Sequence, residues 1–312
     1  MNKIKIIFLA TPDIALASFE YFINSPDYDV LALVTIKPKA QNRGKKIVQR
    51  NITLMAQRYN IPVFEPDKIS KEPEIISSLK KLNPDFMITF AFGQILSQEV
   101  IDIPRIATIN LHASLLPEYR GANPIAQAII DGKQKTGITT MKTVLELDAG
   151  DICMQDEIKI TPDMNVIELM EEISKRSPKL LDKTLKGLYD GSLKSVCQDG
   201  SCATFTKKMK KEDKEIDWNM PSISLHNKIR GMYKLNTNHT IFNNKIIKIL
   251  KTRPSNCSGA ICEVLDITKD GIVVGCSDGA LEILKVKPEG KGEMSALDWA
   301  RGARIKKGDK FI

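Results

Sequence analysis

Long apolar runs are missing from this chain of 312 residues. The longest, at residues 6–10 and around residues 85–92, are much shorter than the roughly 18 apolar residues that a membrane-spanning helix needs. The opening stretch, MNKIKIIFLATPD, lacks the extended apolar core of a secretory signal, because a turn follows its short apolar part. These absences predict a protein without a membrane span or a secretory signal, and we expect it in the cytoplasm.

Histidine and cysteine are both sparse. The chain has three histidines and six cysteines, the latter at positions 153, 197, 202, 257, 262 and 276. Two cysteine pairs are each separated by four residues, whereas structural zinc sites usually hold closer pairs with turn residues between them. We therefore expect reduced, structural thiols and no bound metal.

Acidic residues are absent between Asp29 and Glu65. No apolar residue occurs between Ala40 and Ile47, so this stretch cannot bury enough surface to hold itself rigid, and we expect it to be mobile in the free protein. Seven basic residues lie in the acid-free interval: Lys37, Lys39, Arg43, Lys45, Lys46, Arg50 and Arg58.

Net charge is also unevenly distributed along the chain. Residues 1–205 hold 25 basic and 25 acidic residues, whereas residues 206–312 hold 21 basic and 13 acidic ones. The whole formal charge of +8 therefore lies in the last third. Such a region attracts a polyanion, because binding releases the counterions condensed on phosphates. A well-solvated surface has the same composition, and charge alone does not decide between the two.

Strands and helices alternate in the first two thirds of the chain. Apolar runs predict strands at residues 3–9, 30–36, 85–90, 108–111, 137–144 and 152–160, and apolar periodicity predicts helices at residues 14–23, 71–82 and 165–189. This alternation predicts an α/β domain with a Rossmann-like, doubly wound parallel sheet. Ligands of such sheets bind beyond the carboxyl ends of the strands.

The chain changes character near residue 205. Short apolar stretches separated by glycine turns predict strands at residues 240–242, 246–250, 259–265, 271–276 and 280–286. Their number and length predict a small β-barrel or sandwich, and we expect a smaller C-terminal β-barrel that is similar to an OB-fold. We therefore expect a catalytic domain at residues 1–204 and a basic β-barrel domain at residues 205–312.

Polar side chains gather where the predicted strand at residues 108–111 ends. Asn110, His112 and Ser114 alternate there with apolar residues. An Asn amide donates hydrogen bonds without titrating, and a His can be a base or a cation whose tautomer a neighbouring Asp selects. This set suits acyl transfer to an amine, which needs oxyanion stabilisation and removal of a proton.

The acidic partner of such a site is not settled by residue types. Asp148 and Asp151 both lie in the loop LDAGD, and spacing does not choose between them. The same residues also fit a hydrogen-bonded structural histidine and a simple acidic turn. Composition and spacing alone therefore leave a transferase and a structural role both open.

Two motifs resemble those of known enzymes. HASLLPEYRGANPI at residues 112–125 resembles the Ser-Leu-Leu-Pro signature of the formyltetrahydrofolate-dependent formyltransferases, and LDAGDI at residues 147–152 resembles their acidic loop. Further stretches are similar to one family among them, the methionyl-tRNA formyltransferases. These are ATPDIA at 10–15, NRGKK at 42–46, AFGQIL at 91–96, KEDKEIDW at 211–218 and IRG at 229–231. The resemblance covers nearly the whole chain.

The resemblance implies a reaction and a catalytic set. The family's catalytic Asn, His and Asp carry over onto Asn110, His112 and Asp148. The implied reaction moves the formyl group of 10-formyltetrahydrofolate to the α-amino group of methionine on initiator tRNA, without a metal. The implied folate contacts are Phe92, Gly93, Gln94, Ile95, Ser114, Leu115, Leu116 and Pro117.

Two basic regions are expected to contact the tRNA. The insertion at residues 37–50 follows a predicted strand at the edge where parallel sheets bind ligands, and the second region opens the basic C-terminal third. The tRNA-binding residues that we expect are Lys37, Arg43, Lys45, Lys46, Lys207 and Lys208. We expect the enzyme to act as a monomer.

The chain departs from the family pattern in several places, none of them in the catalytic set. Where the family more often has Gly, Tyr, Pro and Ala, this chain has Ala10, Phe92, Ser97 and Asn123, and MYKLNTNH replaces the Pro-Trp-Pro stretch that often follows Gly231. Formylation of a small amine, hydrolysis of the formyl donor and RNA binding without catalysis are the alternative functions. The basic segments argue against the first two, and the intact Asn, His and Asp argue against the third.

Overall fold

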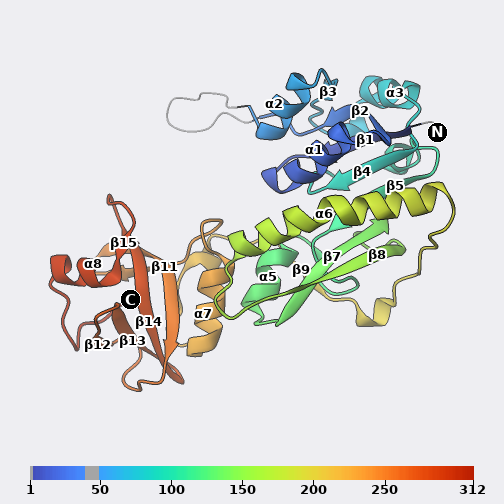
Figure 1. The fold of residues 1–312 in the computed structure, drawn as a ribbon. Helices are drawn as coiled ribbons and strands as arrows, with labels where there is room; N and C mark the ends of the chain where they lie inside the picture. The colour runs from blue at the N-terminus through green and yellow to red at the C-terminus, as the bar shows by residue number, and fades with distance from the viewer. Residues whose placement is uncertain (1–2, 39–48) are drawn as a thin grey trace. The chain divides into compact units, whose positions relative to one another are not determined.

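The computed structural model describes residues 3–38 and 49–312, which divide between two compact units (Figure 1). Unit 1 comprises Met1–Gly121, Thr136–Ile158 and Met170–Phe205. Unit 2 comprises Ala122–Lys135, Lys159–Leu169 and Thr206–Ile312. The expected domain boundary between residues 204 and 205 lies next to the change from unit 1 to unit 2 after Phe205. The other two segments of unit 2 lie earlier in the sequence, within the range that was expected to form the first domain.

Unit 1 contains a seven-stranded sheet with the order β3-β2-β1-β4-β5-β7-β8. Its strands are β1 (Ile4–Ala10), β2 (Tyr28–Val34), β3 (Val63–Phe64), β4 (Phe86–Phe90), β5 (Ala107–His112), β7 (Lys135–Lys142) and β8 (Ile152–Lys159). The strands from β3 to β5 run parallel, and all residues of β4 are buried. Continuous burial explains why such strands have unbroken apolar sequences.

One strand departs from the predicted parallel arrangement. β7 runs antiparallel to β5, with His112 opposite Thr139 and Ile109 opposite Lys142. The connection from β5 therefore returns to the sheet at the edge where β5 ended, instead of crossing to the opposite edge. The predicted α/β class is confirmed, with a sheet that is mostly rather than wholly parallel.

The helices that belong to this sheet are α1 (Leu16–Asn24), which follows a 3-10 turn, α2 (Asn51–Arg58), α3 (Pro73–Lys81), α4 (Gln98–Ile101) and the long α6 (Val166–Tyr189). Among them, α1, α3 and α6 begin and end close to the predicted limits. Pro73 occupies the first turn of α3, where a missing N–H costs nothing, and Lys80 and Lys81 lie in its last turn. The sequence analysis did not predict α2 or α4, which are short.

Unit 2 is an antiparallel half-barrel with the strand order β10-β11-β14-β13-β12. The strands are β10 (His239–Phe242), β11 (Lys245–Ser255), β12 (Val264–Ile267), β13 (Ile272–Cys276) and β14 (Gly279–Pro288), and β15 (Met294–Ser295) pairs with β14. The strand expected from residue 259 begins only at Val264, because Cys262 has a φ of +66° that interrupts an extended chain.

The core of unit 2 is built around aromatic rings. Trp218, Phe242, Trp299 and Phe311 contact one another with ring centroids 5.1 to 6.1 Å apart. Trp299 lies in α8 (Ala296–Ala303), which packs against β14 and β15. The remaining helices of this unit, α5 (Pro124–Ile130) and α7 (Ser222–Gly231), pack against each other.

The contact between α5 and α7 depends on a glycine. A Cβ at Gly231 would lie 2.8 Å from Cγ1 of Ile130 and 3.0 Å from the carbonyl oxygen of Ala126. The motif IRG therefore ends in the residue that lets α7 approach α5 closely. None of the helices within residues 3–38 and 49–312 is long and apolar enough to cross a membrane.

We predict that unit 2 loses stability between pH 7.5 and pH 5.5 because of His226. Burial lowers the pKa of this side chain from 6.5, a shift that the carbonyl of Pro162 partly opposes. Below pH 6.5 the unfolded chain therefore binds a proton more readily than the folded chain does. The free energy of unfolding consequently decreases as the pH is lowered. Both tryptophans lie in unit 2, so tryptophan fluorescence in urea follows this unit.

The matched variant for this measurement is His226→Asn, whose amide corresponds in position to Nδ1 of the histidine and can bond to Oγ1 of Thr252, 2.9 Å from that nitrogen. The variant is expected to lose much of the pH dependence in this range. An unfolding midpoint that shifts with pH as much in the variant as in the parent protein would contradict the prediction.

Candidate active site

Asn110 and His112 lie at the carboxyl end of β5, two residues apart. This spacing places both side chains on the same face of the strand. Thr89 is paired with Asn110 on the neighbouring strand β4, and its Oγ1 donates to Oδ1 of Asn110 at 2.8 Å. Because its oxygen is engaged in this way, the amide of Asn110 presents its Nδ2 to Oδ1 of Asp148, 3.3 Å away.

His112 is buried between two hydrogen-bond acceptors. Its Nε2 lies 2.9 Å from the carbonyl oxygen of Tyr119, which can only accept, so this nitrogen carries a hydrogen. Its Nδ1 lies 3.6 Å from Oδ2 of Asp148. The ring is thus fixed by Tyr119 on one side, and its other nitrogen faces the carboxylate of Asp148.

Asp148 receives hydrogen bonds from two different segments. Oδ1 accepts from Nδ2 of Asn110, and Oδ2 accepts from the main-chain N–H of Gly121 at 2.8 Å. The side chain is 11% exposed, so these donors and the facing His112 ring replace most of its contact with water. Asp151, the other acid of this loop, instead accepts from Oγ of Ser195 at 3.2 Å. The structure thus brings Asp148, and not Asp151, beside His112.

The assembled groups are suited to reactions that develop negative charge on oxygen. An amide N–H, an imidazole ring and a carboxylate lie together at the carboxyl end of β5, where ligands of α/β sheets bind. Leu145 and Leu147 flank the acidic loop and are 63% and 61% exposed. A substrate with an apolar part can therefore contact the same loop that carries Asp148.

The predicted folate segment at residues 92–95 differs in exposure from residue to residue. Phe92 is buried, and Gly93 has a φ of +84°. The amide of Gln94 is used within the protein, since Oε1 accepts from the N–H of Ile69 and Nε2 donates to the carbonyl oxygens of Pro66 and Asp67. Ile95 is 87% exposed. The apolar surface of this segment therefore comes from Ile95.

The predicted folate residues at 114–117 form a turn held by Thr139 of β7. The hydroxyl of Thr139 donates to the carbonyl oxygen of Ser114 at 2.7 Å and accepts from the N–H of Leu116 at 3.2 Å. Ser114 and Leu116 are buried, whereas Leu115 and Pro117 are partly exposed. The turn thus offers Leu115 and Pro117 as its accessible side chains.

The structure describes three of the six residues that are predicted to bind tRNA. Lys37 forms an ion pair with Asp67 at 3.1 Å. Lys207 and Lys208 are exposed in the segment that opens the basic part of unit 2. Arg43, Lys45 and Lys46, together with the mobility expected for their segment, lie outside the described residues.

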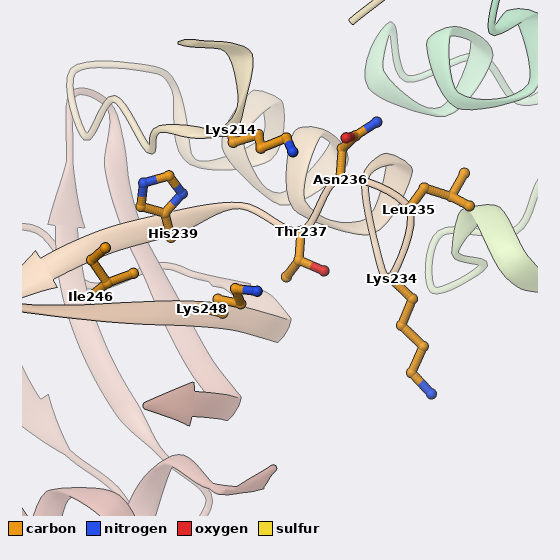
Figure 2. Close-up of a pocket in the computed structure, with 8 residues that line it drawn as sticks. All are labelled: Lys214, Lys234, Leu235, Asn236, Thr237, His239, Ile246 and Lys248. Carbon is orange, nitrogen blue, oxygen red and sulfur yellow. The ribbon is translucent and has the colours of Figure 1, made fainter. Parts of the chain in front are cut away.

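Unit 2 has a basic pocket that the sequence analysis did not identify. Its volume is about 320 Å³, and Figure 2 shows Lys214, His239 and Lys248 around it, with Lys234 pointing away from the other lysines. The other lining residues are Leu235, Asn236, Thr237 and Ile246, so no carboxylate lines the pocket. His239 and Lys248 are opposite each other on β10 and β11. The excess of lysine in this part of the sequence was the signal that could have indicated the pocket.

The cysteines and acids do not form a metal site in the described part of the chain. Within residues 3–38 and 49–312, no group of three or more His, Cys, Asp or Glu side chains is placed to hold an ion. All six cysteines are free thiols, but only Cys153 and Cys276 are buried. Burial raises the pKa of Cys153 to about 11. Cys197, Cys202 and Cys257 are exposed, so burial supports the expected structural role only for Cys153 and Cys276.

Sequence reasoning missed Tyr119 and Gly121, although both contact the site. Tyr119 contributes its carbonyl oxygen to His112, and Gly121 contributes its N–H to Asp148. Every residue type carries a main-chain carbonyl, and every type except proline carries a main-chain N–H. No pattern of side chains could have identified them.

Comparison with known proteins shows similarity along almost the whole chain. The formyl transferase family matches residues 4–185, and the formyl transferase C-terminal domain matches residues 208–304. The methionyl-tRNA formyltransferase of Geobacter metallireducens is 37% identical over 308 residues, which cover 99% of this chain and 98% of that protein. The methionyl-tRNA formyltransferase of Clostridium acetobutylicum is 40% identical over 310 residues, with 98% of each chain covered.

A solved structure has the same fold at low sequence identity. The sugar 3N-formyl transferase WlaRD, crystallised in the presence of dTDP and 5-N-formyl-THF, is 18% identical, with a TM-score of 0.68. The match covers 94% of this chain and 100% of that one. At this identity the similarity concerns the fold, a mostly parallel α/β sheet followed by an antiparallel half-barrel.

Proposed function

The chain belongs to the methionyl-tRNA formyltransferase family, and we propose that Asn110, His112 and Asp148 are the residues with which it catalyses formyl transfer. The enzyme transfers a formyl group from a formyltetrahydrofolate donor to the amino group of methionine on tRNA. The observation that carries the proposal is the joint contact of Asp148 with Asn110 and His112 at the end of β5.

Each of the three residues has a distinct role in this proposal. The methionine amine attacks the formyl carbon, and negative charge develops on the formyl oxygen. Among the described residues, the second Nδ2 hydrogen of Asn110 has no acceptor, so it can donate to that oxygen. The positive charge of the protonated His112 ring stabilises the same oxygen, while Tyr119 and Asp148 hold the ring in place.

Asp148 removes the proton that the attacking amine must lose. The new C–N bond leaves the amine with an excess proton, and the folate nitrogen needs a proton when its bond to the formyl carbon breaks. The carboxylate of Asp148, directly or through a water molecule, accepts the proton of the amine and passes it on to the folate nitrogen, so that one proton is released and one is taken up. Its contacts with Gly121 and Asn110 keep it oriented while it does so.

The donor that we propose is 10-formyltetrahydrofolate, bound by residues 92–95 and 114–117. The exposed apolar side chain of Ile95 supports this placement, as do the partly exposed Leu115 and Pro117. Gly93 supports it through its φ of +84°, which shapes the chain between Phe92 and Ile95. We place the enzyme in the cytoplasm as a monomer.

The acceptor that we propose is initiator methionyl-tRNA. Residues 37–50, including Arg43, Lys45 and Lys46, would contact it near the reacting end, and Lys207 and Lys208 would contact its backbone. The formyl transfer rate with charged initiator tRNA is expected to exceed the rates with elongator methionyl-tRNA and with free amines. Equal rates for the two tRNAs would contradict the choice of initiator tRNA, and faster formylation of a small amine would contradict tRNA as the acceptor.

We also propose that the basic pocket of unit 2 binds a phosphate of the tRNA. Lys214 and Lys248 face it, and neither has an ion pair with a carboxylate in the described part of the chain. Asn238 is fully buried beside the pocket, and its Nδ2 donates to the carbonyl oxygens of Asp213 and Lys214 at 3.2 Å. The main chain of Lys214 is therefore held against β10, which fixes where its side chain starts.

We predict that His112→Ala and Asp148→Ala each lower kcat at least about 100-fold. This is the range expected when a group that stabilises an oxyanion or moves a proton is removed. Asp151→Ala is the matched control, because it removes an acid of the same loop that does not contact His112. Steady-state formyl transfer to methionyl-tRNA measures all three variants. Near-normal kcat in either of the first two variants would exclude this catalytic set.

We predict that Lys214→Ala combined with Lys248→Ala weakens tRNA binding and flattens its salt dependence. Removal of each lysine that binds a phosphate should reduce the slope of log K against log salt concentration by about 1. The KM for formyltetrahydrofolate should not change. The double variant Lys269→Ala with Lys307→Ala removes the same charge from unit 2 outside the pocket. A similar loss of affinity and slope in that control would refute the pocket as a phosphate site.

A further inference from the structure

Asp148 has a backbone conformation that residues other than glycine seldom adopt. Its φ is +50°, in the left-handed region where Cβ crowds the main chain. Conformations of this kind persist at functional sites only where surrounding contacts hold them. The loop between β7 and β8 therefore needs a restraint on its main chain, in addition to the contacts of the Asp148 carboxylate.

Gln198 supplies this restraint on the main chain. Its side chain is 8% exposed, and its Nε2 donates to the carbonyl oxygen of Asp148 at 2.9 Å and to that of Gly150 at 2.7 Å. One amide thereby uses both of its hydrogens on carbonyl groups either side of residue 149. The segment that carries Gln198 is itself attached to the sheet, because Val196 pairs with Ile152 at the start of β8.

The oxygen of the same amide binds Arg120. Oε1 of Gln198 accepts from Nε of Arg120 at 3.1 Å and from its Nη2 at 2.9 Å. Arg120 is 4% exposed and lies between Tyr119 and Gly121, whose main-chain atoms contact His112 and Asp148. Gln198 therefore joins the loop of Asp148 to the segment that contacts both proposed catalytic side chains.

A second contact supports the same connection. Six residues after Gln198, Thr204 accepts hydrogen bonds from the main-chain N–H groups of Tyr119 and Arg120, both at 2.8 Å. The first reaches its Oγ1 and the second its carbonyl oxygen. Residues 198–204 thus hold the segment from Tyr119 to Gly121 at two points, through a side chain and through the main chain.

We propose that Gln198 is a positioning residue that orients the carboxylate of Asp148 toward His112, by clamping the Asp148 main chain to Arg120. This inference rests on the catalytic role proposed above for Asp148. Gln198 does not touch the reacting atoms, and its effect passes through Asp148. The hydrogen bonding requires an amide, since the side chain must donate twice and accept twice.

Gln198→Ala and Gln198→Glu test the proposal with complementary changes. Alanine removes every contact of the amide. Glutamate keeps the size of the side chain and can still accept from Arg120, but it cannot donate to the carbonyl oxygens of Asp148 and Gly150. Both variants are expected to lower kcat at least about tenfold, with the KM for formyltetrahydrofolate and for methionyl-tRNA within about twofold of the parent enzyme.

A double-mutant cycle distinguishes this role from a general loss of structure. In the background of Asp148→Ala, Gln198→Ala should lower kcat by less than about a further factor of two, because the group it positions is already gone. An equal fall in kcat in both backgrounds would overturn the inference. If Asp148→Ala alone remained fully active, the proposed catalytic role of Asp148 would fail first, so the two failures are separable.

The control for stability is Asn227→Ala in unit 2. Asn227 is a buried amide whose Oδ1 accepts from Nε of Arg230 at 2.9 Å, so the variant breaks a comparable amide–guanidinium contact. It should lower Tm without lowering kcat at a temperature well below the transition. If kcat in the Gln198 variants fell only in proportion to Tm, as a loss of folded protein would produce, the positioning role would be excluded.

Discussion

A carboxylate that is mostly removed from water must be compensated by hydrogen-bond donors, and the geometry of the proposed active site depends on how this requirement is met for Asp148. Its two oxygens face the amide of Asn110, the N–H of Gly121 and the ring of His112. These groups come from the end of β5 and the segment after it, whereas Asp148 itself lies in the β7–β8 loop. Satisfying one buried charge therefore brings together segments that are far apart in the sequence.

The same requirement explains why the neighbouring groups are held so firmly. Thr89 fixes the amide of Asn110, and the carbonyl of Tyr119 fixes the ring of His112. These contacts hold the Asn110 amide and the His112 ring in the orientations in which they face Asp148. Catalytic groups oriented before the substrate arrives need no further ordering during the reaction, which is the general basis of electrostatic catalysis. The proposed action of Gln198 extends this principle from side chains to the main chain of the loop.

The two units have different physical characters, which suit different parts of the substrates. Unit 1 has a buried, mostly parallel sheet with polar groups gathered at its carboxyl edge, where a small reacting group can be surrounded. Unit 2 has an aromatic core and a surface rich in lysine, and its basic pocket has no carboxylate in its lining. Chemistry on a formyl group needs the first kind of site, and binding of a polyanion such as tRNA needs the second.

The sequence by itself determined the α/β class, the presence of a smaller C-terminal β domain and the family. It also placed Asn110 and His112 on one face of a strand end, because side chains alternate along a strand with a period of two. Residue types left Asp148 and Asp151 equivalent; the resemblance to the family selected Asp148, and the tertiary structure shows its carboxylate, not that of Asp151, beside His112. The antiparallel direction of β7, the main-chain contacts of Tyr119 and Gly121 and the clamp formed by Gln198 were likewise decided by the fold. Each of these features depends on which distant segments contact one another, and local sequence patterns do not specify this. Main-chain groups are also nearly the same in every residue, so their contacts cannot be predicted from residue types.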